Sequence, residues 1–186
     1  MTETETEALE LAPVAPGAQM PPATREEGNL LWGTCRLLAV QGNELVPRGF
    51  WGRPEAMMAA ILLGRDLGIP DMIAMRRIYV VSGTPTLSAD LVRALIRRAG
   101  HSLVYEKRDS EACVLSGTRR DGGDSLTVTW TLEDARTAGL TGPGWQKYPR
   151  AMLDARATTE LGRALFSDCL GWAIYAPEDF DVHEEA

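Results

Sequence analysis

Apolar residues recur at helical spacing in three segments of the first half of the chain. The first segment ends at Gly42, a residue type that commonly terminates helices. The second begins with Pro54, which suits the first helical position, and closes at Gly68. The third follows Ser88, a good N-terminal cap, and is closed by Gly100. The pattern therefore predicts helices over 26–40, 54–67 and 89–99.

Between and after these helices the pattern changes to that of β-strands. Residues 78–87 combine a β-branched and aromatic run with a Ser-Gly-Thr-Pro turn at 82–85, which predicts a hairpin. Three further strands are predicted over 102–106, 112–118 and 125–130. A Gly-Gly turn at 121–124 joins the last two of these strands. Apolar and polar residues alternate in 126–130, which indicates a sheet with one face in water.

The remaining pattern predicts two more helices. Thr131 and Asp134 have the spacing of a capping box, so a short helix is expected from there to Gly139. A loop over 140–149 precedes a helix over 150–166. Strands and helices do not alternate as they would in a doubly wound sheet. The fold class is therefore α+β, a small antiparallel sheet (hairpin plus three-stranded meander) packed by about five helices.

Charge is distributed unevenly along the 186 residues. Residues 1–27 contain six acidic residues and one arginine, a net charge of −5, and several prolines, so we expect an acidic disordered tail. Residues 177–186 form a second acidic tail, also −5. The core between them, 28–176, carries 18 basic residues, 16 of them arginine, against 15 acidic ones. An arginine-rich body is compatible with a nucleic-acid ligand, although a charge of +3 is also ordinary for a soluble protein.

Several classes of protein are disfavoured by what the sequence lacks. No apolar run approaches the ~20 residues of a membrane helix, and the acidic start does not resemble a signal peptide. Three widely spaced cysteines without a C-x-x-C pair argue against a disulfide framework or zinc ribbon and favour the cytoplasm. A P-loop and the common catalytic motifs are absent. We therefore expect no ATP hydrolysis, no enzymatic activity, no cofactor and no metal.

The segment 142–150 carries the strongest positive signal. Trp145, Lys147, Tyr148 and Arg150 alternate aromatic and basic side chains on a loop that leads into a helix. Bases stack on aromatic rings, Lys and Arg bind phosphates, and a helix N-terminus favours anions. The alternative is that the Trp and Tyr side chains fill the core. Both interpretations stay open at this point.

The following helix and the first hairpin provide further candidate contacts. Arg156 and Arg163 are seven residues apart, so they share a helix face with Glu160 between them and continue the basic track. An exposed Arg-Glu-Arg ladder is the alternative. Arg76 and Arg77 precede the first hairpin and are weaker candidates, because adjacent arginines point in different directions.

These segments, in this order, resemble the RecT family of phage recombination proteins. The resemblance covers about 28–176. Its blocks in the first half are Leu45-Val-Pro, Gly52-Arg-Pro-Glu, Leu63-Gly-Arg-Asp-Leu-Gly-Ile-Pro70, Ile78-Tyr-Val-Val-Ser-Gly83 and Leu87-Ser-Ala. Those in the second half are Thr127-Val-Thr-Trp-Thr-Leu-Glu-Asp-Ala135, Ala138-Gly-Leu140, Trp145-x-Lys-Tyr-Pro-Arg-Ala-Met-Leu153 and Ala155-Arg-Ala157.

The resemblance implies single-stranded DNA binding and ATP-independent annealing of complementary strands in homologous recombination and repair. It also implies assembly of copies into rings or filaments. Carried over residue by residue, it implies that Lys147, Arg150, Arg156 and Arg163 face the DNA backbone. Trp145 and Tyr148 would shape or stack in the same groove, with Arg76 and Arg77 near its hairpin wall.

Partners and alternatives follow from the same resemblance. Family members extend into a C-terminal region that engages an exonuclease or the host single-strand-binding protein, whereas this chain ends soon after Tyr175. Recruitment of those two partners is thus a weaker expectation than binding of DNA. Two other functions remain open: a protein-interaction or regulatory module that keeps the fold but has little DNA affinity, and a metal-dependent nuclease.

Overall fold

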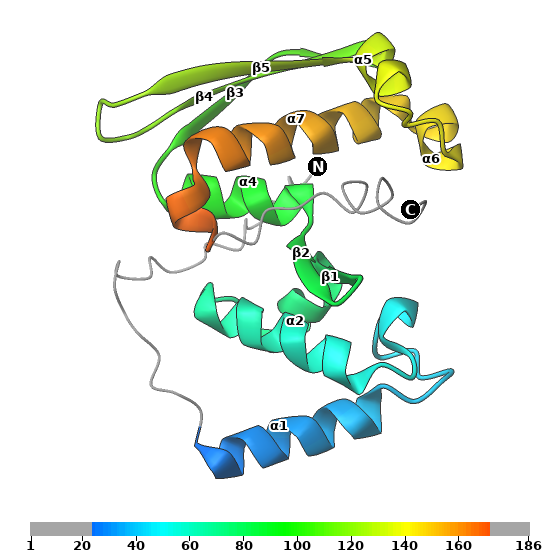
Figure 1. Cartoon of the computed structure of the whole chain (residues 1–186). Helices are drawn as coiled ribbons and strands as arrows, with labels where there is room; N and C mark the ends of the chain where they lie inside the picture. Colours follow the sequence, from blue (N-terminus) through cyan, green and yellow to red (C-terminus); the bar gives the residue numbers. More distant parts are fainter. Residues whose placement is uncertain (1–23, 172–186) are drawn as a thin grey trace, which may run out of the picture.

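The computed structural model describes residues 24–171, and the fold is α+β. It contains seven α-helices, a two-stranded sheet and a three-stranded sheet, both antiparallel. Figure 1 shows the layers: the three-stranded sheet lies against α7, α4 lies beneath α7, and the hairpin, α2 and α1 follow. The predicted fold class is confirmed. The helices are α1 Arg25–Leu38, α2 Pro54–Asp66, α3 Asp71–Arg77, α4 Ala89–Arg98, α5 Leu132–Thr137, α6 Pro143–Lys147 and α7 Pro149–Leu165. The strands are β1 Ile78–Val81, β2 Thr84–Leu87, β3 Ser102–Arg108, β4 Ala112–Thr118 and β5 Ser125–Thr131.

Helix α1 begins earlier than the predicted core boundary. Thr24 caps it: the Thr24 hydroxyl accepts from the Glu27 amide, and the Glu27 carboxylate accepts from the Thr24 amide. This capping box satisfies two amides that a helix start would otherwise leave unpaired. Residues 25–27, assigned above to the acidic tail, are therefore helical. Residues 1–23 of that tail, and the C-terminal tail 177–186, lie outside the described residues.

Helix α3 was not predicted from the sequence, and a glycine permits its position. A Cβ at Gly64 of α2 would lie 2.4 Å from the Cβ of Ala74 of α3, so only glycine allows this close packing. The Arg65 guanidinium also donates twice to the Asp71 carboxylate, at 2.9 and 2.7 Å. Two neighbouring helices are thus fixed around a link of four residues.

The first hairpin has a tighter turn than expected. Only Ser82 and Gly83 form the turn, with φ of +47° and +81°. Two positive φ values suit the twist of a two-residue hairpin. Thr84 and Pro85, predicted to lie in the turn, instead belong to β2. Pro85 is tolerated because a two-stranded sheet has only edge strands.

The three-stranded sheet forms the meander that the sequence predicts, in the order β3-β4-β5. Its central strand β4 is the most buried, and α7 packs across one face with Leu153, Ala157 and Leu161 fully buried. The opposite face is polar: the hydroxyl of Ser116 on β4 lies 2.7 Å from that of Thr127 on β5. The predicted water-exposed face is therefore confirmed.

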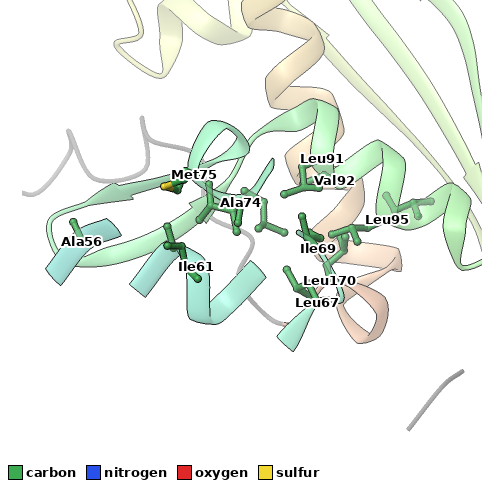
Figure 2. Packing of buried hydrophobic residues seen from close by; sticks show 14 of the residues in the cluster. Ala56, Ile61, Leu67, Ile69, Ala74, Met75, Leu91, Val92, Leu95 and Leu170 are labelled. Atoms are coloured by element: carbon green, nitrogen blue, oxygen red, sulfur yellow. The ribbon is translucent and has the colours of Figure 1, made fainter. Parts of the chain in front are cut away.

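The core is continuous across the helical layers. Figure 2 shows Ile61 of α2, Ala74 of α3 and Leu95 of α4 in one cluster of buried side chains that also includes Leu67, Ile69 and Leu170. Leu170 belongs to a short 3-10 helix, Ser167–Leu170, directly after α7. Arg98 of α4 adds a polar link, donating to the carbonyls of Leu67 and Gly68 at the end of α2. Leu170 thus joins the segment after α7 to the core of the N-terminal helices, and Arg98 joins α4 to the end of α2.

Candidate nucleic-acid interface

The predicted loop over 140–149 contains a helix that separates its two aromatic residues. Helix α6 starts at Pro143, and its Trp145 is 7% exposed and part of the core. Tyr148, which precedes α7, is 57% exposed. For Trp145 the structure agrees with the core-filling alternative, because its ring is not available for stacking with a base. Tyr148 does present its ring to solvent.

Lys147, Tyr148 and Arg150 form an exposed cluster, named here the α6–α7 surface. The Lys147 ammonium lies 5.1 Å from the centre of the Tyr148 ring. Within residues 24–171, neither Lys147 nor Arg150 takes part in an ion pair. Helix α7 starts at Pro149 without a side-chain cap, and its dipole adds partial positive charge here. The cluster therefore has cationic groups and an aromatic face directed at solvent.

Arg156 lies in a different environment from Arg150. It is 8% exposed, and its guanidinium lies 5.4 Å from the centre of the Trp130 ring on β5. The Trp130 indole in turn donates to the Glu160 carboxylate at 2.5 Å. Contrary to the expectation that Arg156 faces DNA, this arginine is packed between α7 and the sheet. Glu160 accepts a hydrogen bond from Trp130, so its role is not limited to pairing with exposed arginines on the same helix face.

The predicted continuous basic track along α7 is not formed. Arg163 is exposed and, being seven residues after Arg156, lies on the same side of the helix. Arg150 is about 120° around the helix axis from Arg156, and roughly 20 Å along the axis from Arg163. Arg150 and Arg163 therefore lie on different faces and at opposite ends of α7.

Arg76 and Arg77 end α3 and lie apart from the α6–α7 surface. Figure 1 draws the β1-β2 hairpin that follows them near α2, separated from α6. Arg77 pairs with Asp90 of α4 at 3.0 Å. Arg76 lines a shallow pocket of about 260 Å³, together with residues 44–47. The structure thus brings together three of the eight predicted site residues at the surface; Trp145 lies in the same segment but is buried, and the other four lie elsewhere.

Sequence reasoning missed a buried carboxylate near the start of α7. Asp154 is 4% exposed, and its oxygens accept from Tyr105 at 2.6 Å, Arg108 at 2.6 Å and Arg93 at 3.2 Å. Arg93 also donates to Thr158 at 3.0 Å. These bonds join α4, β3 and α7. The only sequence signal was an aspartate within an otherwise apolar and basic helix segment, and its partners are 46 to 61 residues away.

The network changes the acid–base behaviour of its members. Burial, reinforced by the hydrogen bond to Asp154, raises the pKa of Tyr105 to about 12. The hydrogen bond to Asp154 also raises the pKa of Arg108. Tyr105 and Arg108 are protonated at neutral pH even without these shifts, so the raised pKa values extend their hydrogen bonds to Asp154 to more alkaline pH.

Within residues 24–171, no three His, Cys, Asp or Glu side chains are grouped so as to hold a metal ion. In the same residues, every helix is too short or too polar to cross a membrane. No protein-family model matches the chain, and no curated protein matches it either.

Proposed function

We propose that this protein binds single-stranded DNA and anneals complementary strands without ATP, as a RecT-type recombination protein. The observation that carries the proposal is the α6–α7 surface. It presents Lys147, Tyr148 and Arg150 to solvent at the start of a 17-residue helix. The ordered resemblance to the RecT family supports it, because these three residues fall within one of the matching blocks.

The chemistry of the surface suits a strand of any sequence. Lys147 and Arg150 offer donors to phosphates, and Tyr148 offers a ring on which any base can stack. Annealing needs no ATP hydrolysis, because the duplex is more stable than its separated strands. A cationic surface accelerates the process by reducing repulsion between the two phosphate backbones.

Protein–protein contact is supported by a second feature, the outer side of α1. Leu30 and Leu37, seven residues apart, are 72% and 77% exposed on one helix face. Within the annealing proposal this face meets another copy of the chain. In the alternative proposal, an interaction module with little DNA affinity, it meets a different protein. Measurement of DNA binding separates the two.

The test is annealing of two complementary labelled oligonucleotides without nucleotide and with a metal chelator, at low and high salt. We expect faster annealing that fades at high salt and leaves both strands intact. Unaccelerated annealing together with absent binding would favour the interaction module. Cleavage on addition of a divalent metal would indicate a nuclease instead.

A pair of double variants tests the surface itself. Lys147→Ala/Arg150→Ala is expected to lower the slope of log affinity against log salt by ~1.4, about 0.7 per lost phosphate contact. The control, Arg25→Ala/Arg36→Ala, removes the same charge from exposed positions on α1. Equal slopes for the two variants would refute the assignment of the α6–α7 surface.

A further inference from the structure

Arg108, the last residue of β3, is held on one side and open on the other. Its Nη2 donates to Asp154 Oδ2 at 2.6 Å, and its guanidinium lies 5.1 Å from the centre of the Tyr105 ring. Its side chain is nevertheless 45% exposed. Within the described residues, Nε and Nη1 make no hydrogen bond. An arginine fork therefore has a fixed orientation and retains donors for a ligand.

Tertiary structure brings this fork next to the α6–α7 surface. Asp154 follows Arg150 by four residues on α7, so the two side chains are neighbours one turn apart on the helix. Arg108 reaches the same turn from β3 through its ion pair with Asp154. A residue 42 positions earlier in the chain than Arg150 is thereby bonded to the next turn of α7.

The charge balance around Asp154 is positive. Asp154 faces two arginines, Arg93 at 3.2 Å and Arg108 at 2.6 Å. Arg93 is 14% exposed and also pairs with Asp90, whereas Arg108 has Asp154 as its only acidic partner in the described part of the chain. Asp90 also pairs with Arg77, so the ion-pair network holds three arginines against two aspartates, and Arg108 is the partner of Asp154 that solvent reaches.

We propose that Arg108 is an additional phosphate contact of the α6–α7 surface, and that Asp154 is a positioning residue which orients it. The inference rests on the proposed DNA binding and names a residue of the same site. A long side chain normally loses conformational freedom when it binds a ligand. Asp154 and Tyr105 have already ordered the Arg108 side chain, so less of that loss remains when a phosphate binds.

The first test compares Arg108→Gln with Lys107→Gln in the full chain. The probe is a labelled oligothymidine, which cannot pair with itself, titrated at several salt concentrations. Glutamine keeps a stem and a donor beside Asp154 but removes the charge. We expect Arg108→Gln to lower the salt slope by ~0.7 and to weaken binding about tenfold at low salt. Lys107 is adjacent in β3 and pairs with Asp109, so its variant should match the parent.

The outcomes distinguish this inference from the proposed function. A parental slope for Arg108→Gln, with a lowered slope for Lys147→Ala/Arg150→Ala, overturns the role of Arg108 and leaves the proposed function standing. If both variants keep the salt slope of the parent, the α6–α7 surface does not bind DNA and the proposed function loses its carrying observation. Thermal melting of each variant shows whether it is folded at the temperature of the titration.

Asp154 is tested by a change that opposes simple electrostatics. Asp154→Asn removes a negative charge, which by charge alone would tighten DNA binding. Positioning predicts weaker binding, with no further loss when Arg108→Gln is already present. Should Asp154→Asn not fold, Arg108→Lys serves instead: it keeps the charge but lacks the fork. If Arg108→Lys binds DNA several-fold more weakly but keeps the salt slope of the parent, the result supports an oriented Arg108 side chain. If its affinity equals that of the parent, the positioning role is refuted.

Discussion

The two halves of the Trp145–Leu165 region use the same residue types for different purposes. At the start of α7, Tyr148 and Arg150 are exposed, and Arg150 has no ion pair among the described residues. Six residues later, Arg156 is buried against Trp130. An arginine in a basic motif is therefore a surface cation or a packing element depending on what covers it.

The elements that bury side chains of α7 lie on both sides of this helix. Figure 1 shows the helix between the three-stranded sheet and α4, and its middle packs against β4, β5 and α4. Buried polar side chains there, Asp154 and Arg156, have partners on those layers. The first turn has fewer neighbours, so its polar side chains stay in water. Substitutions in the two regions should accordingly affect stability in one and DNA binding in the other.

The largest contrast is expected between the two aromatic residues. Trp145→Ala removes a buried ring from the core and should lower the free energy of unfolding by about 3–5 kcal/mol. Tyr148→Ala should change it by less than about 0.5 kcal/mol, because that ring is exposed. Tyr148→Ala should nevertheless weaken oligothymidine binding by ~1–3 kcal/mol through lost stacking. Urea denaturation and DNA titration of both variants check this, and equal unfolding free energies would contradict it.

A smaller difference in stability and DNA binding is expected between alanine substitutions of two arginines of α7. Arg156→Ala should lower the free energy of unfolding by ~2 kcal/mol, because it removes a desolvated cation–π contact. Arg150→Ala should leave stability within about 0.5 kcal/mol and lower the salt slope of DNA binding by ~0.7. A stable Arg156→Ala protein with a lowered salt slope would instead show that Arg156 reaches the DNA.

The smallest effect is expected at alkaline pH from the buried network. The pKa of Tyr105 is about 12 in the folded chain, against an ordinary value of 10.0. The unfolded chain therefore loses this proton first, so the stability contributed by Tyr105 is complete below pH 10 and is lost as pH rises towards 12. Tyr105→Phe cannot ionise, so its urea midpoint should fall less over this range. If the urea midpoints of the parent and Tyr105→Phe changed equally with pH, the raised pKa of Tyr105 would be contradicted.

Features that depend on neighbouring residues were predictable. The capping box at Thr131, the Gly-Gly turn before β5 and the end of α5 at Gly139 all occur where the sequence indicates them. Each involves atoms within a few residues, so the required chemistry is visible in a short window. The candidate segment around Lys147 was found for the same reason, since its aromatic and basic residues are contiguous.

Features that depend on distant partners were not predictable. Trp130 covers Arg156 from 26 residues away, and Arg108 reaches Asp154 from 46. Helix α3 is short and owes its position to the contact between Gly64 and Ala74. Local sequence thus determined the capping box of α5, the Gly-Gly turn before β5 and the segment that carries cations beside aromatic rings, whereas it missed α3 and α6. Tertiary packing alone decided which of those cations stay in water, because burial is set by the elements that fold over a side chain.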